Sequence, residues 1–238
     1  MLGCKIDPSK LVKKLRKRIG NYFGTRLSIS DFDVDEMHYS TDICEHSSAD
    51  ALEYIRVMKR VGRVKGYSVE RCDGINAENG VCLAGNSNGR IFVMYILPGS
   101  DGKDIRIEVR LMKPKAIREW TTDTGIEDQI SELSRKRHDI FMDTVIRIVP
   151  YGIIYKKKEA DEIVRRSVGD KIMRRRMLLL IELIPKKKSL LLAQKALGCR
   201  DVPEVMRAFA EINLSPVTLS KRSDTKYLQS IYEKILAK

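Results

Sequence analysis

The sequence has little of what membrane-spanning and secreted proteins require. The apolar segment 177–184 covers only eight positions and contains Glu182, whereas a spanning helix needs roughly 20 apolar residues. This segment therefore predicts a buried strand or a short core helix. Five cysteines form an odd set at irregular spacings, which favours reduced thiols over a disulfide framework. The N-terminus turns basic at Lys5 without the apolar core of a secretory signal, so we expect a cytoplasmic or nuclear protein.

Recognisable catalytic and metal-binding patterns are also missing. Residues 85–89 lack the Gly-Lys-Ser/Thr ending of a phosphate-binding loop, and the three histidines fall in no local cysteine-protease signature. Six residues are of types that ligate zinc, and four of them are close in sequence: His38, Asp42, Cys44, His46, Cys72 and Cys82. Their spacings match no structural zinc pattern. We therefore expect no catalytic residues, no bound metal and no cofactor, and a protein that is not an enzyme.

One enzymatic alternative stays open. Asp101 or Asp104, followed by Glu108 and Arg110 on one predicted strand, loosely resembles the arrangement by which some nucleases place Mg²⁺ and a cation at a phosphate. An arginine stands where those nucleases use lysine, and arginine cannot lose its proton to act as a base. A metal-dependent nuclease is thus the enzymatic alternative.

Positive charge is the dominant feature that is present. The net charge is +13 and the sequence pI is near 9.5, which favours an acidic partner such as nucleic acid, a ribonucleoprotein or an anionic membrane surface. The charge is concentrated near the N-terminus and in the last third, where residues 171–238 hold 15 Lys or Arg against six acids.

The first predicted element is a basic amphipathic helix. Asp7 is a plausible cap and Pro8 suits the first helical position. Apolar residues spaced three or four apart form one stripe: Leu11, Leu15, Ile19, Tyr22 and Phe23. The rest of the cylinder carries the residues that we predict to bind phosphates or a membrane surface: Lys10, Lys13, Lys14, Arg16, Lys17 and Arg18. The alternative is that the stripe packs on the body of the same protein.

An acidic block follows this helix. Residues 27–53 contain eight carboxylates and no Lys or Arg. Such a block could pair with the basic helix and hold it until a stronger polyanion competes. Deleting residues 27–46 would then strengthen polyanion binding at low salt. The alternative is an exposed acidic loop.

The body is predicted to be α+β, with a mixed or antiparallel sheet and helices. We expect helices over 50–61, 124–139, 159–168, 189–197, 202–212 and 225–237, and strands over 64–69, 90–97 and 104–112. Residues 77–89 read as turns, and 140–154 as β-rich around 145–149. The organisation predicted is a basic N-terminal helix (1–26), an α+β core domain (27–185) and a basic helical C-terminal region (186–238).

Two basic triplets flank the apolar segment 177–184. Arg174, Arg175 and Arg176 precede it, and Lys186, Lys187 and Lys188 follow Pro185, which we expect to stop the element. The apolar residues should lie inside and both triplets outside. The triplets are therefore the second predicted surface for nucleic acid or another anionic surface, and electrostatic binding there should depend steeply on salt.

In size, charge, basic amphipathic N-terminus and lack of a catalytic motif, the chain resembles the small matrix proteins of negative-strand RNA viruses. The resemblance is carried by residues 10–18 and 174–188, and the chain departs from it in lacking a proline-rich late-domain signature. It implies a structural, virion-associated protein that bridges a ribonucleoprotein and an anionic membrane and that associates with itself. The other non-enzymatic alternative is a nucleic-acid-binding protein without a membrane role.

Overall fold

The computed structural model describes residues 7–71, 74–75, 78–198 and 201–237. Within these residues the chain forms ten α-helices, a five-stranded antiparallel sheet and a two-stranded sheet. The predicted α+β class is therefore confirmed. One large cluster of buried apolar residues joins the five-stranded sheet to the helices on its covered face and to the C-terminal helices.

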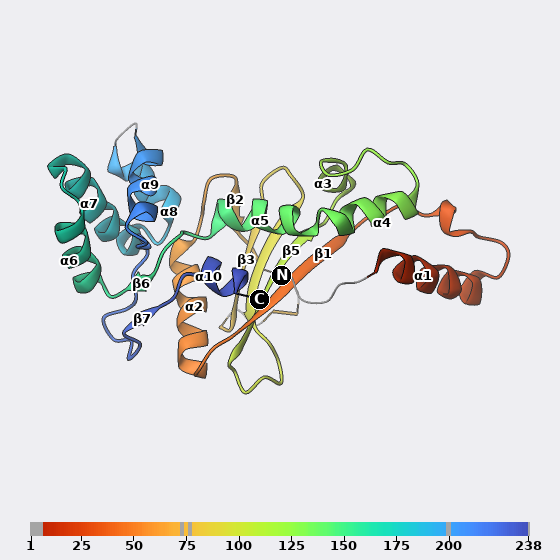
Figure 1. Ribbon diagram of the computed structural model, residues 1–238, viewed down its shortest axis with the longest axis horizontal. Helices are drawn as coiled ribbons and strands as arrows, with labels where there is room; N and C mark the ends of the chain where they lie inside the picture. The colour runs from red at the N-terminus through yellow and green to blue at the C-terminus, as the bar shows by residue number, and fades with distance from the viewer. Residues whose placement is uncertain (1–6, 72–73, 76–77, 199–200, 238) are drawn as a thin grey trace.

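The main sheet has the strand order β1-β5-β4-β3-β2 (Figure 1). The predicted hairpin is confirmed as β4 and β5, in which Phe92 lies opposite Val109. The strands span Met37–Cys44 (β1), Tyr67–Val69 (β2), Gly80–Gly85 (β3), Arg90–Ile96 (β4) and Asp104–Leu111 (β5). Two of them were not predicted, because β1 lies in the acidic block read as a loop and β3 lies in the region read as turns.

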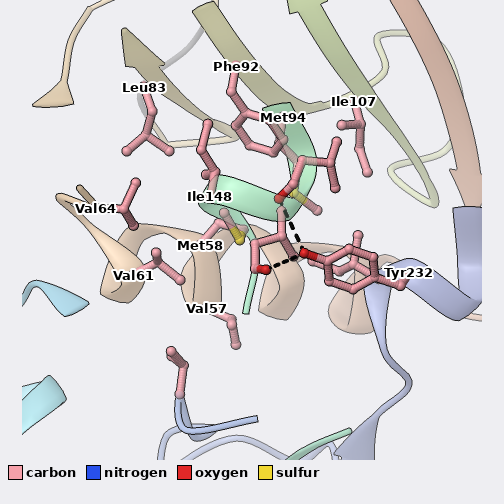
Figure 2. Packing of buried hydrophobic residues seen from close by; sticks show 14 of the residues in the cluster. Val57, Met58, Val61, Val64, Leu83, Phe92, Met94, Ile107, Ile148 and Tyr232 are labelled. Atoms are coloured by element: carbon pink, nitrogen blue, oxygen red, sulfur yellow. Dashed lines mark hydrogen bonds between the residues drawn. The ribbon is translucent and has the colours of Figure 1, made fainter. Parts of the chain in front are cut away.

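Helices α2 (Ser48–Val61) and α5 (Arg137–Ile148) cover one face of this sheet. Figure 2 shows where they meet it: Val57, Met58 and Val61 of α2 and Ile148 of α5 converge on the sheet face. The sheet residues in this packing are Leu83, Phe92, Met94 and Ile107. Tyr232 closes the packing from the C-terminal helix and donates to the carbonyl oxygen of Val149 at 2.5 Å.

The prediction of β structure around residues 145–149 is wrong. Residues 145–148 belong to α5, and Val149 is its C-cap. The buried side chains of α5 recur at helical spacing: Ile140, Phe141, Thr144, Val145 and Ile148. The β-branched residues that suggested a strand instead form the face of a helix that packs on the sheet, so tertiary packing overrides their intrinsic preference.

The N-terminal side of the molecule holds α1 (Pro8–Phe23), a short 3₁₀ turn (Ile29–Asp31), α3 (Pro114–Arg118) and α4 (Ile126–Arg135). Asp7 caps α1 as predicted, accepting a hydrogen bond from the backbone N–H of Ser9 at 3.0 Å. Ser47, not Asp50, caps α2, because its hydroxyl oxygen accepts from the backbone N–H of Asp50 at 3.1 Å. The predicted end of α2 at Gly62 is confirmed.

The opposite side is helical. It contains α6 (Lys157–Ser167), α7 (Lys171–Lys187), α8 (Leu190–Leu197) and α9 (Val202–Glu211). The small sheet of β6 (Ile154–Tyr155) and β7 (Tyr227–Leu228) connects this part to α10 (Ile231–Leu236). The last helix begins at Ile231 and not at residue 225, because residues 227–228 pair with β6.

Helix α7 settles the choice that the sequence left open for residues 177–184. The segment is helical, and Pro185 lies inside the last turn instead of ending the element. Only one stripe is buried, formed by Met177, Leu180, Ile181 and Ile184, while Leu179 is 38% exposed. The prediction that the whole segment lies inside is therefore wrong. The three-part organisation stays a prediction, although its boundary at 185 falls within α7.

Two predictions about cysteines and membranes can also be compared with the structure. Cys82 is disulfide-bonded, so the expectation that all thiols are reduced is wrong for this residue. Cys4, Cys72 and Cys199 lie outside the described residues. Among the helices that the structure describes, none has both the length and the apolar character needed to cross a bilayer.

Candidate nucleic-acid interface

The two predicted basic surfaces lie at opposite ends of the molecule. Figure 1 shows α1 at one end of the longest axis and the pair α6 and α7 at the other. The two sets of cations therefore form separate surfaces and cannot line a common groove.

At the first end, the apolar stripe of α1 packs on the protein itself. Val12 is buried, and Leu11, Leu15 and Ile19 pack against a small cluster that includes Ile126 and Ile130 of α4. Arg16 adds an ion pair, donating from Nε to Glu127 of α4 at 2.9 Å. The stripe thus holds α1 on α4. The other predicted cations, Lys10, Lys13, Lys14, Lys17 and Arg18, stay exposed on the outer face.

The last two residues of the predicted stripe, Tyr22 and Phe23, are exposed. Tyr22 is 84% exposed. Phe23 is 48% exposed, although the centroid of its ring lies 6.2 Å from the ring centroid of Phe32. These two aromatic residues are thus available to a partner.

Three carboxylates of the acidic block form ion pairs with the body of the protein. Asp42 accepts two hydrogen bonds from Arg106, at 2.7 and 2.8 Å. Glu53 pairs with Arg56 at 2.6 Å, and Glu45 lies 3.0 Å from Lys234. None of these three cations belongs to α1. These ion pairs therefore give no support to the hypothesis that the acidic block pairs with the basic helix.

At the second end, the arginine triplet is divided between two faces of α7. Arg174 and Arg175 face α6, whereas Arg176 donates to Asp201 at 3.1 Å on the side of α9. Arg174 Nε also donates to the carbonyl oxygen of Val168 at 2.8 Å, which fixes the turn between the two helices. The expectation that the whole triplet forms one outer surface is therefore not met.

The lysine triplet lies at the other end of α7. Lys186 pairs with Glu182 one turn earlier, and Lys187 and Lys188 are exposed. Lys188 adopts a left-handed conformation (φ 49°), and its carbonyl oxygen would lie 2.5 Å from a Cβ added at Gly62. Glycine is therefore needed at position 62 so that the turn after α7 can approach α2.

Helices α6 and α7 form a hairpin with a basic groove between them. The groove has a volume of about 480 Å³. Its lining combines residues spaced three and four apart on both helices: Lys157, Asp161, Arg165, Lys171, Arg174, Arg175, Leu178, Leu179 and Glu182. Such spacing puts side chains on one face of each helix.

A second groove, of about 430 Å³, begins where the first one ends, because Lys157 lines both. Its walls are the end of α7 (Ile184, Pro185), Arg60 of α2 and the segment 217–222. Arg60 donates from Nη1 to the carbonyl oxygen of Thr218, which ties this segment to α2. Burial lowers the pKa of Arg60, and the charge of nearby Glu53 opposes that effect. Lys221 and Arg222 add two exposed cations.

The two linings, taken over the described residues, hold eight cationic side chains and two carboxylates. Both carboxylates pair with lysines: Asp161 with Lys157, and Glu182 with Lys186. The hydrogen bond from Lys186, together with its charge and that of Lys157, lowers the pKa of Glu182. The lining as a whole is thus positively charged, and we call it the basic groove.

Sequence reasoning placed only Arg174 and Arg175 in this groove. The residues that it missed are Arg60, Lys157, Arg165, Lys171, Lys221 and Arg222. One signal was available, because Lys157, Asp161 and Arg165 recur every four residues, as do Lys171, Arg175 and Leu179. The contribution of Arg60 and of residues 217–222 depends on tertiary packing and has no local signature.

The residues of the nuclease alternative lie on the open face of the sheet or at its edge. Glu108 is buried and accepts hydrogen bonds from Tyr95 at 2.8 Å and from Arg110 at 2.6 Å. Asp104 is four positions away on the same strand, about 13 Å at the usual rise per residue, and Asp101 is in the preceding turn. Such a separation is too large for one shared metal ion. Among the described residues, no group of three or more His, Cys, Asp or Glu could hold a metal ion.

Comparisons with known proteins add no relative to this description: no family model, no curated protein and no solved structure matches the chain.

Proposed function

We propose that this chain is a non-enzymatic binding and assembly protein that binds nucleic acid or a ribonucleoprotein in the basic groove. The observation that carries the proposal is the composition of that groove, in which eight cations face two carboxylates that are already paired with lysines. Cations along a groove are what a phosphate backbone requires, and the resulting affinity falls as salt rises.

The proposal includes the structural, matrix-like role that the sequence resemblance implies, with association of the protein with itself and a cytoplasmic, nuclear or virion location. A purely nucleic-acid-binding role is the alternative without membrane contact. The nuclease alternative gains no support from Glu108, because both of its oxygens already accept hydrogen bonds from Tyr95 and Arg110.

The test removes three exposed groove cations that make no described structural contact: R165A, K171A and R175A. Arg174 and Arg176 are kept because they bond to Val168 and Asp201. The matched control, K158A with R166A and K195A, removes the same charge from exposed positions outside the groove. We expect the groove variant to bind labelled RNA about tenfold more weakly at about 100 mM salt, and the control to change much less. Equal losses in both variants would refute the proposed site.

A second surface, at α1, favours an anionic membrane as a further partner. Tyr22 and Phe23 project beside exposed cations that include Lys17, Arg18 and Arg26. Aromatic side chains next to cations are the combination by which peripheral proteins lie in a lipid interface. This surface and the basic groove lie at opposite ends of the molecule, so one protein molecule could bridge a membrane and a nucleic acid.

A further inference from the structure

The basic groove is extended along α7. Its two parts share Lys157 and follow α7 from Lys171 to Pro185, a length of about 21 Å at 1.5 Å per residue. The volumes of about 480 and 430 Å³ are in the range of sites for small ligands. They match a thin, extended chain better than a broad partner surface.

The charges along this groove are not uniform. Arg165, Lys171 and Arg175 gather at one end, beside the turn between α6 and α7. At the other end the cations are Arg60, Lys157, Lys221 and Arg222, in a part whose described lining contains no carboxylate.

Between these ends the lining changes character. Leu178 and Leu179 of α7 line this part of the groove together with two carboxylates, Asp161 of α6 and Glu182 of α7. Leu179 is 38% exposed. A phosphate gains nothing from leucine and is repelled by carboxylate, so this middle part favours another portion of the ligand.

A duplex does not satisfy this pattern. It keeps the faces of its bases inside the stack, and proteins read it by inserting a helix or ribbon into its major groove. Here the concave surface belongs to the protein. An unpaired strand has bases that can leave the backbone, cover apolar side chains and donate from their amino groups to carboxylates.

We propose that the basic groove takes a single strand of nucleic acid, with the backbone on the cations at both ends and unpaired bases over Leu178 and Leu179. This inference rests on the proposed function, because it assumes that the groove binds nucleic acid. Glu182, whose side chain is 48% exposed, accepts from an exocyclic amino group such as that of cytosine. Single-stranded RNA and single-stranded DNA share this chemistry.

The experiment measures the affinity of the full chain for labelled single-stranded RNA, single-stranded DNA and the matching duplexes. Each strand is roughly 20 nucleotides long, which covers one binding site. The variants are L179S, its control L192S on α8, which is 42% exposed and outside the groove, and the triple variant R165A/K171A/R175A. We expect single strands to bind about tenfold more tightly than duplexes. L179S should weaken single-strand binding about three- to fivefold, somewhat less than the loss of one base stacked on an aromatic side chain, and leave duplex binding unchanged.

The outcomes separate this inference from the proposed function. If the triple variant weakens single strands and duplexes equally, and duplexes bind as tightly as single strands, the groove binds nucleic acid but the inference of a single strand is wrong. The inference of a single strand is also refuted if L179S loses no more affinity for single strands than L192S does. If the triple variant binds every probe like the wild type, the proposed function itself fails. The two single-stranded arms report which sugar the groove prefers.

Discussion

Arg90 shows how a buried cation can connect three parts of the fold. It begins β4, donates from its guanidinium to Glu119 after α3 and to Asp143 of α5, and lies 5.4 Å from the centroid of the Trp120 ring. Burial of a charge is costly unless the charge is paired. The two carboxylates and the aromatic ring offset that cost and hold α3 and α5 against the sheet.

We expect R90M to lower the free energy of unfolding by about 2–4 kcal/mol, because Glu119 and Asp143 would each lose the ion pair with buried Arg90. Both carboxylates are partly hydrated, which keeps the loss below that of a fully buried pair. R147M is the control. Arg147 pairs with the same Asp143 but is 58% exposed, so its loss should cost less than about 1 kcal/mol. Urea unfolding followed by far-UV circular dichroism measures both values, and similar losses would contradict the role given to Arg90.

The same network makes a pH dependence. Burial would raise the pKa of Asp143, but hydrogen bonds from Arg147 and Arg90 outweigh it and lower the pKa below its usual value. A carboxyl whose pKa is depressed in the folded state stabilises the fold above its unfolded pKa of about 3.9 and loses that effect as the pH falls further. The stability difference between wild type and R90M should therefore shrink below about pH 4.

The functional residues were only partly predictable one by one. Composition identified the triplets, but it could not separate Arg175, which lines the groove, from Arg176, which pairs with Asp201. Neighbouring residues on a helix point in directions about 100° apart, so a run of three cations cannot share one face. The helical character of residues 174–176 had to be known first.

At the scale of elements, prediction succeeded where the pattern was local. The alternation in β5 and the turn after β4 identified the hairpin, and the spacing in α1 identified that helix with its cap. Strand β1 was missed because it lies within the acidic block 27–53, which suggested a loop. Its alternating buried residues, Tyr39, Thr41 and Ile43, take their meaning from pairing with β5 more than 60 residues later.

Helix α1 carries the prediction that belongs to this scale. Y22S with F23S removes the exposed aromatic residues without changing charge, and I146S, at an apolar position of α5 that is 63% exposed, serves as a control. In flotation with vesicles that contain anionic lipid, we expect wild type and control to float, and the double variant to float several-fold less. Equal flotation of all three would refute the membrane surface at α1.

At the scale of the whole molecule, the arrangement of charge was not predictable. The sequence located positive charge in the first helix and the last third, but whether these regions meet depends on the sheet between them. In the structure, the five-stranded sheet and its two helices separate α1 from α6 and α7 (Figure 1). The result is a protein with two cationic ends, which suits a role in connecting two anionic partners.

The most direct test of the account is the salt dependence of single-strand binding at the basic groove. Each phosphate contact contributes about 0.7 to the slope of log K against log salt concentration for a single strand. The variant R165A/K171A/R175A should therefore lose about two from that slope, and the control K158A/R166A/K195A should keep the wild-type slope. A slope that is unchanged in the groove variant, or lowered equally in the control, would contradict the claim that the groove between α6 and α7 is where this protein binds nucleic acid.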